Sequence, residues 1–317
     1  MIGMNRKNIG HGQATGKIIL MGEHAVVYGE PAIAFPFEET SIMTTIESDQ
    51  MMTLDCQYFC GNLAEVPARL KSVQKVIYQT LAELGQENTT LKITINSTIP
   101  AERGMGSSAA VAVAIVRGLF DYFKTPCSPE TLLRLVDEAE KIAHGNPSGI
   151  DAAATSGSKP IFFIKGQPLE LFPMNVSNAY LIVADTGIKG QTREAVSDVA
   201  HLFEEDKQLA AKHITELGRL TVQAKQAILM NDVPLLGTSM NQAHEHLKAL
   251  TVSNKQLDHL VETARNNGAL GAKLTGGGRG GCLIALVDSK RQAEKIADSL
   301  KNAGATAAWI QSLEVKK

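Results

Sequence analysis

The first third of the chain has short apolar or β-branched stretches broken by glycine, proline and charge, a pattern typical of strands. A longer amphipathic segment, from about Val66 to Leu84, predicts a helix that Gly85 closes. Leu91–Ile95 alternates and ends ahead of Pro100. We expect strands at four places: 17–21, 31–35, 41–47 and 91–95.

Two further helices are predicted before residue 144. The segment 108–123 is apolar nearly all round and rich in alanine. It is shorter than the ~20 residues that cross a bilayer, so we expect a buried core helix. Ser128 and Pro129 form a typical helix start, and the helix that follows is predicted to run to about Ala143.

The second half is mostly helical and ends in a compact α+β pattern. Long amphipathic helices are predicted at 193–230 and 234–250, with a third from a Ser253 cap to Asn267. A strand, a glycine-rich loop, a strand, a helix and a strand follow, at 269–274, 275–281, 282–287, 290–303 and 306–310. Proline and asparagine cluster at 167–178, which predicts two domains, residues 1–172 and 173–317.

Composition excludes several classes of partner. The 317 residues are 44% hydrophobic and 20% charged, as in a globular protein, and the formal net charge is −2. A chain without a broad positive field is not expected to bind nucleic acid or an anionic membrane. Because we find no apolar membrane span and no apolar signal core in residues 1–17, we expect a cytoplasmic protein.

Cysteine and histidine spacing does not favour zinc. Cys56 and Cys60 resemble half a zinc site, but no second pair of suitable spacing follows, so we expect free buried thiols. His244 and His246 stand two apart in a predicted helix and face different sides, so a solvated helix face is the simpler interpretation.

The strongest local signal for chemistry is the loop 104–110, Gly-Met-Gly-Ser-Ser-Ala-Ala, between a predicted strand and the buried helix. Glycine permits close approach of a ligand, and a helix N-terminus favours phosphate. A plain turn is an equally good interpretation of this loop taken alone. It matches neither a Walker A loop nor a dinucleotide-binding fingerprint.

Two carboxylates flank a second turn, Glu140 before and Asp151 after a Gly-Asn-Pro-Ser-Gly stretch. They could converge on one cleft, one as a metal ligand and one as a base, or simply be surface charge at a helix end. His144 is equally well explained as a helix C-terminal cap.

Two more segments complete the set. The loop after Lys273 has five glycines among six residues, more than a hairpin needs, which favours contact with phosphate or a cover over the active site. The segment 16–29, Gly-Lys-Ile-Ile-Leu-Met-Gly-Glu-His-Ala-Val-Val-Tyr-Gly, presents Glu23 and His24 where a strand ends. Taken alone, this segment is an ordinary strand and turn.

Together these segments resemble the GHMP kinases, the family of galactokinase, homoserine kinase, mevalonate kinase and phosphomevalonate kinase. Three family motifs occur in family order between Lys17 and Cys282. The opening segment and His-Gly-Asn-Pro-Ser-Gly-Ile-Asp (144–151) are most similar to the branch that phosphorylates mevalonate. The resemblance implies an N-terminal domain with a left-handed β-α-β unit and a ferredoxin-like C-terminal domain.

The resemblance also implies residue roles. Asp151 is the expected base, and Lys17 steadies the developing alkoxide. Ser108 and Glu140 are the expected Mg²⁺ ligands. Gly276, Gly277 and Gly278 are the expected functional glycines of the loop after Lys273. The expected ATP-binding residues are Pro100, Arg103, Gly104, Met105, Gly106, Ser107, Ser108 and Ala109. The expected substrate-binding residues are Glu23, His24, Ser148 and Thr192.

The expected partners are ATP and mevalonate, with a homodimer as the candidate assembly. Phosphomevalonate kinase is the alternative within the family, but no extra cation set for a substrate phosphate is evident. A ligand sensor derived from the family should have lost Asp151 or Lys17, and both are present. One departure stands out: Glu102 and Arg103 precede Gly104, where the family usually has small residues and glycine.

Overall fold

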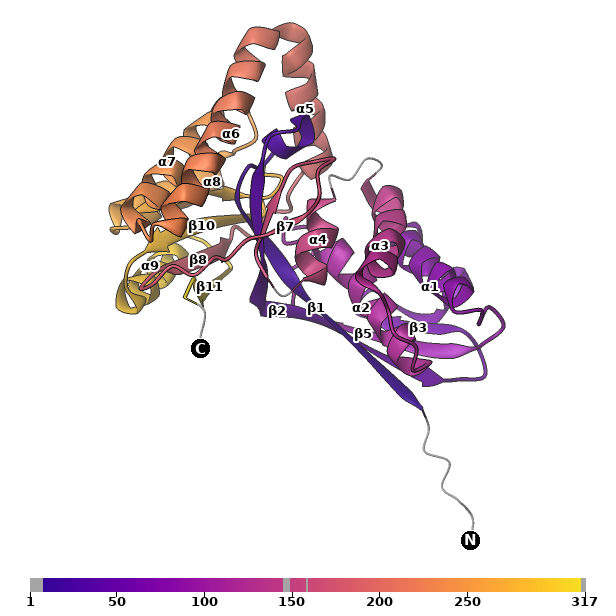
Figure 1. Ribbon diagram of the computed structural model, residues 1–317. Helices are drawn as coiled ribbons and strands as arrows, with labels where there is room; N and C mark the ends of the chain where they lie inside the picture. Colours follow the sequence, from indigo (N-terminus) through magenta and orange to yellow (C-terminus); the bar gives the residue numbers. More distant parts are fainter. Residues whose placement is uncertain (1–7, 145–148, 158, 315–317) are drawn as a thin grey trace. The chain divides into compact units, whose positions relative to one another are not determined.

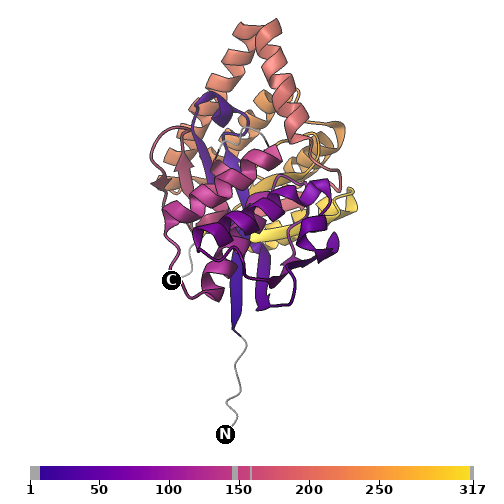
Figure 2. The same ribbon diagram turned by 90° about the vertical axis from the view of Figure 1, so that its right-hand side faces the viewer.

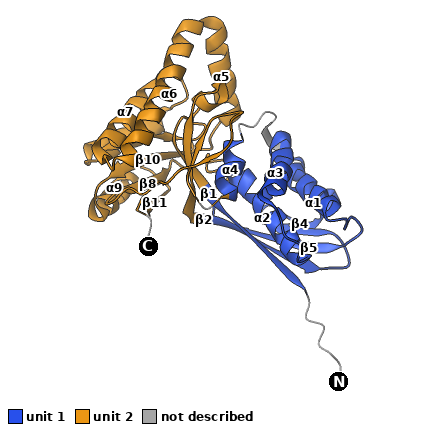
Figure 3. Ribbon diagram, in the orientation of Figure 1, with its two compact units in different colours: residues 1–16, 40–99, 106–156 blue, residues 17–39, 100–105, 157–317 orange. Residues whose placement is uncertain are grey.

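The computed structural model describes residues 8–144, 149–157 and 159–314. The chain forms two compact units, coloured separately in Figure 3. Unit 1 comprises residues 1–16, 40–99 and 106–156, and unit 2 comprises residues 17–39, 100–105 and 157–317. Strands β1 (Ile9–Met21) and β2 (Ala32–Ser48) each begin in one unit and end in the other.

Unit 1 combines strands with helices (Figure 1). Its strands follow the order β4, β3, β5 and the C-terminal part of β2. Strands β3 and β5 are parallel, and α1 lies between them in the chain, which gives a β-α-β unit. The elements of unit 1 are β3 (Thr53–Cys56), β4 (Phe59–Asn62), η2 (Leu63–Glu65), η3 (Ala68–Leu70), α1 (Lys71–Glu83), β5 (Leu91–Ser97), α2 (Ser107–Tyr122), α3 (Pro129–His144) and α4 (Ile150–Ser156).

Helix α2 is the core of unit 1, as its apolar composition predicts, and packs against α1, α3 and α4. Strand β1 approaches it very closely. A Cβ at Gly12 would lie 1.9 Å from the carbonyl oxygen of Ala114, so only glycine fits there. Thr44 donates a hydrogen bond of 2.8 Å to the same carbonyl and ties β2 to the helix.

Unit 2 contains an antiparallel four-stranded sheet in the order β11-β8-β10-β9. With its helices this is the β-α-β-β-α-β pattern of a ferredoxin-like domain, so the α+β fold class is confirmed. Val183 in the central strand β8 pairs with Ile284 of β10 and Trp309 of β11. The strands of this unit are β6 (Ile161–Phe163), β7 (Glu170–Leu171), β8 (Tyr180–Asp185), β9 (Gly271–Thr275), β10 (Cys282–Val287) and β11 (Ala307–Ser312).

The helices of unit 2 begin and end near their predicted limits, with one exception. The single helix predicted at 193–230 is two helices, α5 and α6, which fold into a hairpin (Figures 1 and 2). Asp206 breaks the run because its carboxylate accepts the backbone N–H of Leu209 and caps α6. The helical elements are η1 (Ala25–Tyr28), α5 (Thr192–Glu205), α6 (Lys207–Leu229), α7 (Val233–Ala249), α8 (Lys255–Asn266) and α9 (Lys290–Asn302).

Other local predictions need correction. Asn254, and not Ser253, caps α8, since its side chain accepts the N–H of Leu257 at 2.8 Å. The strands predicted at 31–35 and 41–47 are parts of one strand, β2. The four cysteines are free, as predicted, but only Cys282 is buried.

No helix in the described ranges combines the length and apolar composition that crossing a bilayer requires. No group of three or more histidine, cysteine, aspartate or glutamate side chains in the same ranges is arranged to hold a metal ion.

Candidate active site

Unit 1 places three of the predicted site residues on neighbouring helices. Ser108 lies in the first turn of α2, Glu140 near the C-terminal end of α3, and Asp151 in the first turn of α4. Helix α2 packs against α3 and α4, and α3 packs against α4. The Glu140 side chain is only 3% exposed. This part of the chain thus contributes one hydroxyl and two carboxylates.

The start of α2 has the backbone geometry of a helix N-terminus, which favours an anion. Gly106 is its N-cap residue with φ of 70°, a left-handed conformation that glycine adopts without strain. The N–H groups of Ser107, Ser108 and Ala109 belong to the first turn, where a helix provides no backbone acceptor. Ala109 is fully buried in this turn. Ser148 lies outside the described residues.

In unit 2, Lys17 joins strand β1 to the loop 100–105, which we call the central loop. Its backbone N–H donates to the Met105 carbonyl at 3.0 Å, and its ammonium donates to the Gly104 carbonyl at 2.9 Å. Lys17 and Met105 are both almost completely buried. The ammonium position is therefore tied to the backbone conformation of the central loop.

A buried ion pair lies beneath the end of β1. Lys273 on β9 bonds to the carboxylate of Glu23, and neither side chain is exposed. Lys273 also donates to the carbonyl of Leu274 at 2.8 Å. Burial raises the pKa of Glu23, against the opposing effect of the Lys273 ammonium, and burial lowers the pKa of Lys273. The pair fixes Glu23 as a rigid part of this site.

His24 has one defined tautomer. Its Nε2 lies 3.0 Å from the carbonyl oxygen of Gly277, which can only accept, so Nε2 carries the proton and Nδ1 is an acceptor. Burial lowers the His24 pKa to about 4, so the ring is neutral near pH 7. Its φ of 59° is unusual for a residue other than glycine, and such strain concentrates at functional positions.

The glycine loop, residues 276–281, packs closely against neighbouring segments. A Cβ at Gly277 would lie 2.1 Å from the Thr192 hydroxyl oxygen, and one at Gly276 would lie 3.0 Å from Cα of Gly104. Gly278 has φ of 77°, and a Cβ at that position would lie 2.0 Å from the carbonyl oxygen of Val252. The loop therefore meets both Thr192, at the start of α5, and the central loop.

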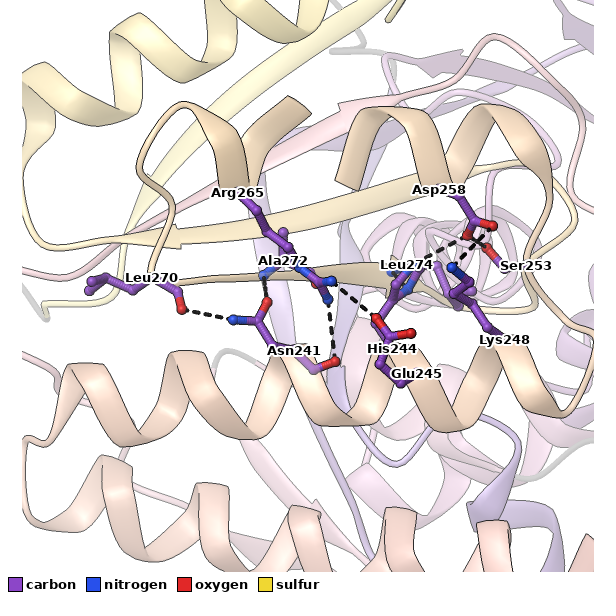
Figure 4. Close-up of polar contacts among 10 residues, drawn as sticks. All are labelled: Asn241, His244, Glu245, Lys248, Ser253, Asp258, Arg265, Leu270, Ala272 and Leu274. Atoms are coloured by element: carbon purple, nitrogen blue, oxygen red, sulfur yellow. Dashed lines mark hydrogen bonds and ion pairs between the residues drawn. The ribbon is translucent and has the colours of Figure 1, made fainter. Parts of the chain in front are cut away.

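Strand β9 contains Lys273 and leads into the glycine loop. Side chains of helices α7 and α8 form hydrogen bonds with the outer edge of this strand (Figure 4). Asn241 accepts the N–H of Ala272 at 2.9 Å, and His244 Nδ1 accepts the N–H of Leu274 at 3.3 Å. Arg265 donates to the Ala272 carbonyl at 2.9 Å. These side chains satisfy backbone groups that an edge strand would otherwise leave unpaired.

The two histidines of α7 do face different sides, as predicted. His244 is not on a solvated face, however: it is 1% exposed, and its Nε2 lies 3.3 Å from the Asp258 carboxylate (Figure 4). His246 meets His213 of α6, with 2.8 Å between the Nδ1 atoms. The helical spacing is enough to predict that the two side chains point to different sides. Their partners are known only from the packed structure.

Sequence reasoning missed two charged residues of this region. It assigned no role to Lys273, although a lysine three positions before the first glycine of such a loop is a usable signal. Asp185, which ends the unpredicted strand β8, accepts a hydrogen bond of 2.8 Å from Arg103. Nothing in the spacing of Arg103 and Asp185 along the chain indicates that contact.

Comparisons with known proteins match both halves of the chain. The family model for the GHMP kinase N-terminal domain matches residues 71–158, and the model for the C-terminal domain matches residues 224–306. The mevalonate kinase of Pyrococcus furiosus is 33% identical over 315 residues, which cover 92% of this chain and 93% of the relative. The chain belongs to the GHMP kinase family. It is an ATP-dependent phosphotransferase that acts on a hydroxyl group.

Solved structures of this GHMP kinase's relatives agree in fold. The mevalonate kinase of methicillin-resistant Staphylococcus aureus MRSA252 is 35% identical, with a TM-score of 0.74, and the match covers 97% of this chain and 100% of that one. The mevalonate kinase of L. major, crystallised with R-mevalonate, is 29% identical with a TM-score of 0.80, covering 97% and 95%. The predicted family and fold are thereby confirmed.

Proposed function

We propose that this protein is a mevalonate kinase. It transfers the γ-phosphate of ATP to the 5-hydroxyl of mevalonate and releases 5-phosphomevalonate and ADP, a step of the mevalonate pathway of isoprenoid biosynthesis. The proposal rests mainly on similarity to mevalonate kinases over nearly the whole chain. One of these relatives was crystallised with R-mevalonate. The buried Glu23 and the fixed His24 supply a rigid polar surface for such an acceptor.

The nucleotide is proposed to bind where the central loop leads into α2. Backbone N–H groups of the first turn and the positive end of the helix dipole favour the phosphates. We assign this function to Pro100, Gly104, Met105, Gly106, Ser107, Ser108 and Ala109, with the glycine loop 276–278 as a further phosphate contact. Arg103 belongs to the same predicted set of ATP-binding residues.

Asp151 is proposed as the base and Lys17 as the residue that stabilises the alkoxide. The substrate hydroxyl gives its proton to the Asp151 carboxylate while its oxygen bonds to the γ-phosphorus and the bond from that phosphorus to ADP breaks. Phosphoryl transfer needs positioning and charge neutralisation more than covalent help, so one base and one ammonium suffice. The bond from Lys17 to the Gly104 carbonyl gives that ammonium a fixed direction.

The residues present fit Mg²⁺ as the cofactor of ATP. Ser108 offers a hydroxyl and Glu140 a carboxylate, both hard oxygen donors, and α2 and α3 pack together. When bound, Mg²⁺ neutralises charge on the ATP phosphates.

The substrate side is proposed to consist of Glu23, His24, Ser148 and Thr192. With Nε2 committed to the Gly277 carbonyl, His24 presents Nδ1 as an acceptor for a hydroxyl of the substrate. We further propose that the enzyme is cytoplasmic, that it needs neither nucleic acid nor membrane, and that a homodimer is the assembly to test for.

A panel of acceptors tests the assignment. ADP release from Mg·ATP is measured with mevalonate, phosphomevalonate, galactose and homoserine at equal concentrations. Mevalonate alone should support rapid turnover. Faster turnover of phosphomevalonate would move the protein to the alternative function one step along the pathway, and turnover of none of the four would contradict the proposal.

A further inference from the structure

The central loop is joined to the β8–α5 loop, residues 186–191, by its two charged residues. Gly190 donates its N–H to the Glu102 carbonyl at 2.8 Å, and Lys189 forms a 2.6 Å ion pair with the Glu102 carboxylate. That ion pair is exposed, at 75% and 59%, so it contributes little stability. Arg103 makes the buried connection.

Arg103 uses all three of its nitrogens within unit 2. Nε donates to the Asp185 carboxylate at 2.8 Å, Nη2 to the Gly187 carbonyl at 3.0 Å, and Nη1 to the Ala101 carbonyl at 3.3 Å. The side chains of Arg103 and Asp185 are 16% and 7% exposed. Asp185 also accepts the N–H of Gly187 at 2.9 Å, so one carboxylate holds both loops.

The position of Arg103 affects the residues that follow it in the central loop. Gly104 and Met105 follow it directly, and their carbonyls accept the ammonium and the backbone N–H of Lys17. The Arg103 carbonyl also lies against Gly281 of the glycine loop, where a Cβ would come within 2.7 Å. A shift of Arg103 would therefore move the acceptors that direct Lys17.

We propose that Arg103 is a positioning residue, held by Asp185, that sets the conformation of the central loop and through it the position of the Lys17 ammonium. This function takes the place of the nucleotide contact that the sequence predicts for Arg103. The inference rests on the proposed kinase function for its kinetic consequences. Its geometric basis is independent of which alcohol is the acceptor.

Physical chemistry supports a fixed pair. Arginine presents donors in a planar fork, so the carboxylate that ends β8 and a carbonyl of the loop that follows can hold it in a single orientation. Asp185 ends the central strand of the four-stranded sheet, which makes it a rigid anchor. Removing one partner leaves an uncompensated charge, whereas removing both leaves none. Variants of the two residues should therefore depend strongly on each other.

The test is a double-mutant cycle in the full-length protein with Arg103→Met, Asp185→Asn and both together. The kinetic constants are measured for Mg·ATP, with the Kd of Mg·ADP by calorimetry and melting on the same preparations. Each single variant should lower kcat/KM about tenfold or more, a loss typical of small misplacement. The double variant should be no worse than either, and Arg103→Lys should be intermediate.

A direct phosphate ligand would behave differently. In that case Arg103→Met would weaken Mg·ADP binding while Asp185→Asn left binding and turnover unchanged, and this result would overturn the proposal. So would losses that multiply in the double variant, or lower melting temperatures with unchanged kinetics. The exposed pair Arg219 and Glu216, at 2.8 Å on α6, provides the matched control as Arg219→Met and Glu216→Gln, with kinetics unchanged.

The Mg·ADP measurement separates this inference from the choice of substrate. ADP binding requires no acceptor alcohol, so equal weakening in Arg103→Met and Asp185→Asn supports the positioning role even if mevalonate is not turned over. If mevalonate is turned over but the two variants differ as a direct ligand requires, the kinase assignment stands and the positioning role fails.

Discussion

At the scale of single residues, the proposed chemistry depends most on Asp151. Replacing it by asparagine keeps the shape and removes the charge that accepts the proton. We expect kcat and kcat/KM to fall together by about two orders of magnitude or more, with little change in ATP affinity. Asp137→Asn is the control, because Asp137 forms an exposed ion pair with Lys141 on α3.

Melting measured on the same Asp151→Asn preparation distinguishes the other explanation. Asp151 lies in the first turn of α4, where a carboxylate also stabilises a helix. If that were its only function, the melting temperature would fall and kcat would be preserved, contrary to our expectation.

The second residue-scale prediction concerns Glu140. Glu140→Gln keeps the size of the side chain but weakens its binding of a divalent cation. We expect the Mg²⁺ concentration for half-maximal rate to rise severalfold or more, with the fold intact. Glu138→Gln, two residues earlier on α3 and 45% exposed, should leave it unchanged. An identical Mg²⁺ titration in Glu140→Gln and the unaltered protein would exclude Glu140 as a ligand.

Single residues also mark the limit of sequence reasoning. The glycines near residues 104 and 277 could be predicted as ligand loops because their number exceeds what turns need. The contact of Glu23 with Lys273 spans 250 positions, and that of Arg103 with Asp185 spans 82. Such contacts depend on how the strands are ordered in the sheet, which local patterns do not encode.

At the scale of elements, the outer edge of β9 is held by a buried neutral histidine. Burial lowers the His244 pKa from 6.5 to about 4, so the unfolded chain binds its proton at a higher pH than the folded one. Stability is then lost as the pH falls from 6.5 towards 4. The contribution of His244 to this loss is up to about 3 kcal/mol in the free energy of unfolding.

The variant His244→Asn should flatten that pH dependence. Urea unfolding at pH 7, 6, 5 and 4.5 gives the free energy of unfolding for each protein. The loss between pH 6.5 and 4.5 should be smaller in His244→Asn, while His201→Asn, at a side chain 65% exposed, should match the unaltered protein. An unchanged slope in His244→Asn would contradict the buried neutral state.

Elements with a distinctive composition and clear flanking turns could be predicted well. Helix α2 and strand β10 lie within one residue of the prediction, since their composition and flanking turns are unambiguous. Strand β8, a short apolar run, was missed because it follows closely on the proline- and asparagine-rich segment 167–178. Helix α4 was missed because it has only seven residues, most of them small, and these carry little helical pattern.

At the scale of the whole molecule, no single cut in the chain separates the two compact units. Strands β1 and β2 each contribute residues to both, and the central loop belongs to unit 2 although its flanking segments belong to unit 1. Composition changes along the chain indicate one boundary at most, so this interleaving could not be predicted. The boundary at residues 172 and 173 remains a prediction, with one matched family model on each side of it.

The central claim is the transfer of phosphate to the 5-hydroxyl of mevalonate, and proton-coupled ³¹P NMR of the reaction product tests it most directly. A phosphate ester on that primary alcohol has two protons on the adjacent carbon, so its resonance should split into a triplet as mevalonate and Mg·ATP are consumed. An unsplit ester resonance would place the phosphate on the tertiary hydroxyl. The appearance of inorganic phosphate and ADP alone would contradict a kinase acting on mevalonate.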